Sequence, residues 1–146
     1  SILGAVGQTG LTAFFGIERL AATHGLHLGD VVVVSAAAGA VGSVACALAR
    51  RRGCTVIGVC GSDDKAAWLM EQQLCSQALN YRHANFGPAL AQACDGRVAM
   101  YWDNVGGVIS DLVCCCPAPP IYACAHTPTH THTHTHTHTH TDAPRR

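Results

Sequence analysis

Apolar residues along the chain follow two spacings, one typical of strands and one typical of helices. Residues 31–34 are four consecutive valines. Such an uninterrupted β-branched run predicts a strand that is buried on both faces of a parallel sheet. The alanine-rich stretch from Ala40 to Arg52 predicts a helix, which Gly53 would end. A strand followed by a helix in this way is the first half of a βαβ unit.

The same alternation extends to about residue 113. Residues 11–24 predict a helix whose apolar face is formed by Leu11, Phe14, Phe15, Ile17 and Leu20. Further strands are expected at 55–60, 78–80 and 98–102, and further helices at 65–74, 86–93 and 109–113. We therefore predict an α/β fold with four strands of a doubly wound parallel sheet over 31–113, after a connecting helical region over 1–30.

The composition changes after Val113. Residues 114–146 consist largely of Cys, Pro, Thr and His, and Pro117, Pro119 and Pro120 would break both a helix and a strand. We predict a disordered low-complexity tail there. With the sheet ending at its fourth strand, the 98–102 strand would expose an apolar edge, so the isolated chain is expected to be poorly stable.

Thr and His alternate strictly from Thr129 to Thr141. A repeated CA dinucleotide encodes this pattern, so one hypothesis is that the tail is translated intron or frameshifted sequence. The alternative is metal binding by the six alternating histidines, since imidazoles bind Zn, Cu or Ni. The adjacent cysteines 114–116 lack the spaced pairs of a structural zinc site, and we assign no metal ligand.

Charge and cysteine content narrow the possible settings. The formal net charge is zero, which does not favour nucleic acid or an anionic membrane as partner. Nine cysteines without a disulfide pattern, together with no signal peptide and no apolar stretch of ~20 residues, favour a reducing cytoplasm. The chain starts at Ser1 and not at Met, as a fragment or a processed product would. The sequence makes no prediction of oligomeric state.

The turn between the valine strand and its helix is the strongest local motif. Gly39 would let the backbone approach a pyrophosphate, Gly42 would let the helix pack closely on the strand, and the helix start offers free N–H groups. Ala37 occupies the first position of a G-x-G-x-x-G frame, so the strict fingerprint is not met. The alternatives are therefore a Rossmann-type dinucleotide site and a tight turn without a ligand.

The end of the second strand bears on cofactor choice. An NAD site usually has an acidic residue there to bind the ribose hydroxyls, whereas this chain has Gly61 and Ser62, followed by Lys65. Glycine leaves room for a 2′-phosphate and lysine supplies charge, which favours NADP. Asp63 and Asp64 are the contrary signal, and their alternative role is to cap the next helix.

Five motifs in order resemble a known family. They are residues 3–13, 36–43, 61–65, 80–81 and 101–107. Together they are similar to the zinc-independent prostaglandin reductases (15-oxoprostaglandin 13-reductases) of the medium-chain dehydrogenase/reductases, over about residues 1–113. The spacing of Lys65 and Tyr81 is closer to prostaglandin reductase 2 than to reductase 1. The resemblance implies a partial Rossmann domain that is a fragment of such an enzyme.

The resemblance also implies roles for individual residues at a cofactor site. The pyrophosphate would be wrapped by Ala38, Gly39, Ala40 and Val41. Lys65 would bind the 2′-phosphate, Tyr81 would serve the adenosine phosphate end, and Asn104 would contact the cofactor at the carboxyl edge of the sheet. Tyr81 could instead be a buried core ring, and Asn104 could simply cap its loop.

Members of this family use NADPH to reduce the carbon–carbon double bond of α,β-unsaturated ketones such as 15-oxoprostaglandins. The resemblance thus implies NADP as cofactor and a small-molecule enone as substrate of the full-length parent, with lipid metabolism as its setting. No residue of this chain is nominated as catalytic, and the fragment is expected to be catalytically silent. The alternatives are a non-catalytic nucleotide-binding or interaction module and the non-functional product of an aberrant gene model.

Overall fold

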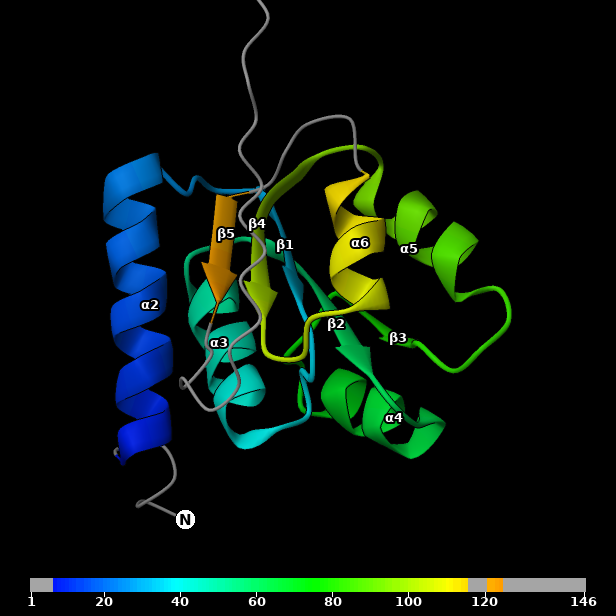
Figure 1. Cartoon of the computed structure of the whole chain (residues 1–146). Helices are drawn as coiled ribbons and strands as arrows, with labels where there is room; N and C mark the ends of the chain where they lie inside the picture. The colour runs from blue at the N-terminus through cyan, green and yellow to red at the C-terminus, as the bar shows by residue number, and fades with distance from the viewer. Residues whose placement is uncertain (1–6, 116–120, 125–146) are drawn as a thin grey trace, which may run out of the picture.

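The computed structural model describes residues 7–115 and 121–124 (Figure 1). In chain order the elements are α2 (Gln8–His24), β1 (Val31–Val34), α3 (Ala40–Arg51), β2 (Thr55–Cys60), α4 (Asp63–Glu71), β3 (Gln77–Asn80), α5 (Phe86–Cys94), β4 (Val98–Asp103), α6 (Val108–Cys114) and β5 (Ile121–Cys124). The α/β prediction is confirmed, and the predicted strands and helices up to residue 113 all occur with small shifts at their ends.

All five strands are parallel and lie in the order β3-β2-β1-β4-β5. The chain runs outward from the central β1 to β2 and β3, and then returns to the other side of β1 for β4 and β5. In a parallel sheet of this kind, ligands bind beyond the carboxyl ends of the strands where the direction of winding reverses. The strand order therefore directs attention to the ends of β1 and β4.

The prediction that the sheet stops at its fourth strand is wrong. Residues 121–124 add β5 beside β4, with Ile121 opposite Met100 and Cys124 opposite Asp103. The far side of β4 is therefore paired. The short run Ile-Tyr-Ala-Cys suits a strand, and the three prolines precede it in the sequence. The rest of the predicted tail, including the Thr-His repeat, lies outside the described residues.

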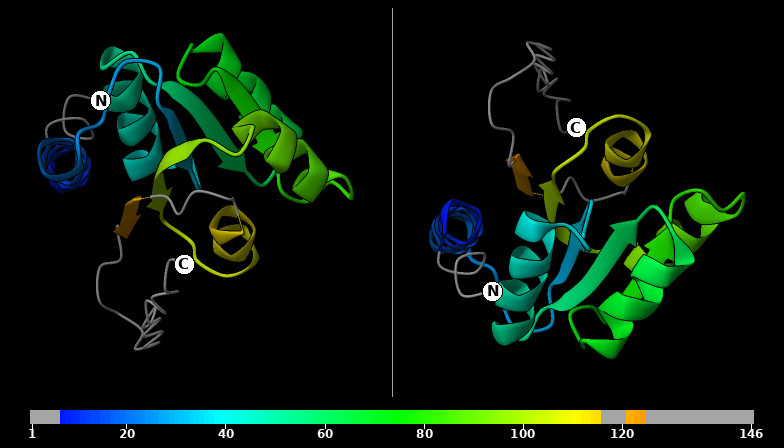
Figure 2. Two further views of the ribbon diagram at one scale, coloured as in Figure 1. Left: turned by 90° about the horizontal axis from the view of Figure 1, so that it is seen from above. Right: turned by 90° about the horizontal axis from the view of Figure 1, so that it is seen from below.

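Helices cover both faces of the sheet, as the end-on views of Figure 2 show. On one face, Val32 and Val34 pack with side chains from α2, α3 and α4. On the other face, Val31 and Val33 pack with side chains from α5 and α6. Because successive strand residues point to opposite faces, the four-valine run serves both cores at once. All four valines are buried, as the sequence predicts.

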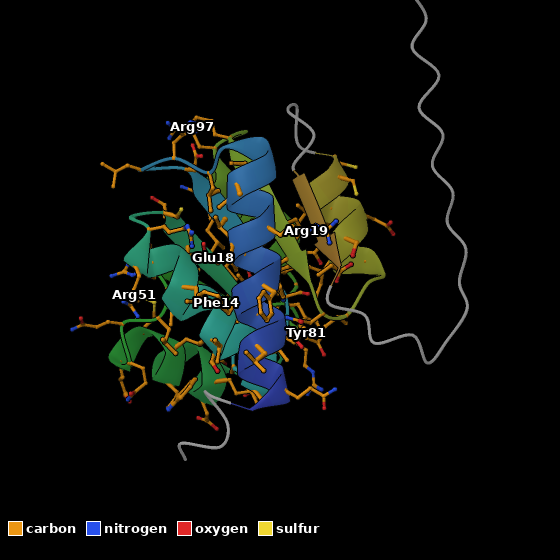
Figure 3. All side chains as sticks on the ribbon, turned by 90° about the vertical axis from the view of Figure 1, so that its left-hand side faces the viewer. Phe14, Glu18, Arg19, Arg51, Tyr81 and Arg97 are labelled. Atoms are coloured by element: carbon orange, nitrogen blue, oxygen red, sulfur yellow. The ribbon has the colours of Figure 1, made fainter. Side chains whose placement is uncertain are left out.

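Helix α2 buries a narrower strip than its sequence predicts. Ala13 and Ile17 are fully buried, whereas Leu11, Phe14 and Phe15 are exposed, and Phe14 is visible on the outer surface in Figure 3. The helix approaches the sheet so closely that a Cβ at Gly16 would collide with the Trp102 ring. This close contact at Gly16 limits how much of the helix circumference can be covered. The side chain of Leu20 lies outside the described part.

No helix among the described residues is long and apolar enough to cross a bilayer. None of the seven cysteines from Cys46 to Cys115 forms a disulfide, and five of them are buried.

Candidate functional site

The turn after β1 is compact and leads directly into α3. Ala36 adopts a left-handed conformation with φ of 47°, and the Gly39 N–H donates to the Ala36 carbonyl at 2.9 Å. A Cβ at Gly42 would lie 2.9 Å from Ala37 Cα and nearer still to the Ala36 oxygen. Glycine at position 42 is therefore what allows α3 to begin this close to the strand, as the sequence motif predicts.

The amino end of α3 carries no side-chain cap. Gly39 occupies the N-cap position without a capping hydrogen bond, and the first turn holds no acidic residue. The first N–H groups of a helix have no acceptor within the helix, and the helix dipole is positive at this end. Backbone N–H groups at Ala40 and Val41 are thus available to an anion such as a phosphate.

A second wall forms where β2 ends and α4 begins. Ser62 is the N-cap, and its Oγ accepts the Lys65 N–H at 3.4 Å. The serine therefore takes the capping role that the sequence also allowed for Asp63. Asp63 is engaged elsewhere, because its Oδ1 accepts Asn80 Nδ2 at 2.9 Å and lies 2.9 Å from His83 Nε2. Hydrogen bonds from Asn80 and His83 lower the pKa of the Asp63 carboxyl.

Tyr81 follows β3 and lies against the end of β2. Its N–H donates to the Cys60 carbonyl at 3.0 Å, and a Cβ at Gly61 would lie 3.2 Å from the Tyr81 ring. Tyr81 is 43% exposed, so the alternative of a buried core ring is wrong. The Arg82 guanidinium carbon lies 5.9 Å from the centre of that ring, within cation–π range.

These walls enclose a cleft of about 400 Å³ at the carboxyl edge of the sheet. Of the predicted site residues, Ala38, Gly39, Lys65 and Tyr81 line it, whereas Ala40, Val41 and Asn104 do not. Gly61 and Ser62 also line the cleft. Asp63 lines a smaller pocket of about 150 Å³ instead, beside α5.

The sequence interpretation missed Arg82 and Val105 as lining residues of the cleft. The signal for Arg82 was its position, since it comes directly after Tyr81 at the carboxyl end of a predicted strand. Val105 had no such signal, because it lines the cleft only through the way its loop is held.

Asn104 fastens its loop to β1. Its Nδ2 donates to the Ser35 carbonyl at 2.6 Å, and its Oδ1 accepts the Trp102 indole N–H at 3.1 Å. Its backbone N–H also donates to Ser35 Oγ at 2.8 Å. Both ends of the amide are thus used within the protein, which matches the loop-capping alternative for this residue.

Asp103 holds the same loop through hydrogen bonds to its carboxylate. Its carboxylate accepts the N–H groups of Val105 and Gly106 and the hydroxyls of Ser110 and Tyr101, at 2.7 to 3.1 Å. Burial by itself would raise the pKa of Asp103, but these donors outweigh it and hold the pKa below its usual range. Burial raises the pKa of Tyr101 to about 12. A charged carboxylate therefore fixes the 103–107 loop that places Val105 at the cleft.

Curated proteins similar to the chain are oxidoreductases. Prostaglandin reductase 1 of Bos taurus is 44% identical over 111 residues, which cover 75% of this chain and 32% of the bovine protein. YfmJ of Bacillus subtilis (strain 168), named provisionally as an NADP-dependent oxidoreductase, is 45% identical over 112 residues, covering 76% and 32%. The chain thus spans about one third of the length of these relatives. Closeness to prostaglandin reductase 2 stays a prediction.

Solved structures share the fold. CurA of Vibrio vulnificus, solved in complex with NADPH, is 34% identical with a TM-score of 0.70, over 77% of this chain and 32% of CurA. A quinone oxidoreductase of Pseudomonas syringae pv. tomato DC3000 is 28% identical with a TM-score of 0.61, covering 74% and 32%. No protein-family profile matches the chain.

Proposed function

We propose that the cleft binds NADP(H), because 75% of the chain is similar to a prostaglandin reductase and 77% to a structure solved with NADPH. One observation carries the proposal. Gly39 and Lys65 come from two different strand–helix units, and they line the same cleft at the carboxyl edge of the sheet. A tight turn that binds no ligand would not need the Lys65 side chain, which comes from the next strand–helix unit, to line the same cleft.

The described residues fit the parts of a dinucleotide in turn. The uncapped start of α3 suits the pyrophosphate, which the N–H groups of Ala40 and Val41 would bind although their side chains lie outside the cleft. The exposed Tyr81 ring beside Gly61 suits the adenosine end. Asn104 would act on the cofactor only through the loop that it holds, because its amide is already hydrogen-bonded to the protein.

The charges of the cleft favour NADP over NAD. Among the described residues, no carboxylate lines the cleft, and Asp63 is held by Asn80 and His83 at the separate pocket. An acidic residue that would bind the ribose hydroxyls of NAD is therefore missing from the lining, and Lys65 supplies a positive charge where a 2′-phosphate would lie.

We propose that the longer protein reduces the carbon–carbon double bond of α,β-unsaturated ketones, with 15-oxoprostaglandin-like molecules as the substrate class. When bound, the reduced nicotinamide would supply the hydride for the β-carbon. The residues described here would bind and orient the cofactor, whereas stabilisation of the enolate oxygen would come from parts that this chain does not span. The cytoplasm is the compartment that nine cysteines without a disulfide pattern favour.

Lys65 offers a direct test, because it is the only lysine in the chain. Reductive methylation with carbon-13 formaldehyde labels its side chain and the α-amino group of Ser1, and keeps both positive charges. NADPH should shift the Lys65 methyl resonance strongly, and NADH, which lacks the 2′-phosphate, should shift it much less. An unmoved Lys65 resonance at saturating NADPH would refute the proposed binding mode.

A second assay separates binding from catalysis. The 146-residue chain should bind NADPH, measured by the change in nucleotide fluorescence, and should not oxidise it when an enone is added. Enone-dependent NADPH oxidation by the purified chain would contradict the proposed division between cofactor binding here and catalysis elsewhere.

A further inference from the structure

The cleft is lined by a second cationic side chain besides Lys65, and the proposed function assigns it no role. We propose that Arg82 is a further specificity-determining residue, whose guanidinium binds the 2′-phosphate together with the Lys65 ammonium. This inference rests on the proposed function, because it concerns the way in which the same cleft selects NADPH over NADH.

The two cations reach the cleft from different elements. Lys65 lies in the first turn of α4 and Arg82 is the second residue after β3, yet both line the same cleft. Tyr81 lines it as well, with the Arg82 guanidinium carbon 5.9 Å from its ring centre. Among the residues that the structure describes, no acidic side chain forms an ion pair with either cation. Their charges thus remain available to an incoming anion.

A set of hydrogen bonds fixes the turn that carries Arg82 to the helix that carries Lys65. Asn80 Oδ1 accepts the Arg82 N–H at 3.1 Å, and Asn80 Nδ2 donates to Asp63 Oδ1 at 2.9 Å. His83 Nε2 lies 2.9 Å from the same carboxylate oxygen. Asn80 therefore links the backbone of Arg82 to the first turn of α4. The Asp63 carboxylate is occupied by Asn80 and His83. These hydrogen bonds would keep Lys65 and Arg82 at a constant separation and keep the Asp63 charge from neutralising them.

The chemistry of arginine suits this position. A planar guanidinium can offer two parallel N–H donors to a phosphate while it stacks on an aromatic ring. The Tyr81 ring would hold the guanidinium in place, which reduces the side-chain entropy lost on binding. NADH has a hydroxyl where NADPH has the 2′-phosphate, so these contacts should act on NADPH alone.

The test measures dissociation constants of the full 146-residue chain for NADPH and NADH by fluorescence titration. Arg82→Gln should weaken NADPH about tenfold, as expected for the loss of a hydrogen bond to a charged group, and change NADH by less than about twofold. Arg82→Lys should recover part of the loss. Arg97→Gln is the matched control, because it removes the same charge at the amino ends of the strands, far from Tyr81 in Figure 3. It should change neither constant.

The outcomes separate this inference from the proposed function. If the wild-type chain binds NADPH and Arg82→Gln leaves the ratio of the two dissociation constants unchanged, the role of Arg82 is refuted while the proposed function stands. An equal loss for both nucleotides refutes it too, because it would mean that Arg82 serves a part common to both. If the wild-type chain binds neither nucleotide, the proposed function and this inference fall together.

Discussion

Replacing Gly42 by alanine sets two physical effects against each other. Alanine is the better helix former, which alone would stabilise the helix by about 1 kcal/mol. However, the added Cβ would lie 2.9 Å from the Ala36 carbonyl carbon and from Ala37 Cα, whereas ordinary contacts begin at 3.4 Å. Because these atoms are backbone, no side chain can rotate away, and either α3 or the turn must shift. Overpacking of this kind costs roughly 1–3 kcal/mol, and a backbone collision belongs at the upper end.

We therefore expect Gly42→Ala to lower the free energy of unfolding by about 2 kcal/mol, measured by urea denaturation followed by circular dichroism. Gly39→Ala is the matched control. Its Cβ would meet only the Ala36 oxygen, at 3.1 Å, and its backbone is extended, so stability should fall by less than about 1 kcal/mol. That variant should instead weaken NADPH binding, since Gly39 lines the cleft. A Gly42→Ala chain as stable as wild type would refute the close packing of α3 on the turn.

Four further predictions concern burial and hydrogen bonding. Asp103→Ala should cost about 2–4 kcal/mol of unfolding free energy because it removes the acceptor of two part-buried N–H groups and of the buried Tyr101 hydroxyl. Since the pKa of Asp103 is lowered in the folded state, its ionisation stabilises the protein at neutral pH, and this contribution is lost as the pH falls below about 4. The free energy of unfolding from urea melts should therefore depend less on acid pH in Asp103→Asn. The pKa of Tyr101, about 12, predicts a late ionisation step in an ultraviolet titration, and Tyr101→Phe should abolish that step. Ile17→Ala should cost about 2–4 kcal/mol and Phe15→Ala less than about 1 kcal/mol in the same melts, because only the first is buried; equal costs would contradict the orientation of α2.

Local patterns were enough to predict most of the fold. The four valines, the alanine-rich helix and the glycines between them each favour the same βαβ arrangement, so local preference and tertiary packing agree there. Strand β5 was missed because four residues between two biased segments carry little periodic signal, and pairing with β4 supplies what the sequence does not display. The burial of α2 depended on contact with Trp102, which no periodicity reveals.

The site was predictable where a single motif carries it. Gly39, Lys65 and Tyr81 each lie at the carboxyl end of a strand or just beyond it, and topology alone brings such positions together. The engagement of Asn104 with Ser35 joins residues 69 apart in the chain, so only the folded structure shows that its amide holds a loop. The pairing of Asp63 with Asn80 and His83 was hidden for the same reason, and it removes one of the two carboxylates that argued for NAD.

The central claim is that the cleft at the carboxyl edge of the sheet is a dinucleotide site. Titrating NADPH into the nitrogen-15-labelled chain and following backbone amide resonances tests it most directly. The account predicts shifts concentrated at residues 36–42, 61–65 and 81–82, which come from three separate segments around one cleft. Shifts concentrated instead at the smaller pocket beside α5, or spread evenly over the surface, would contradict it.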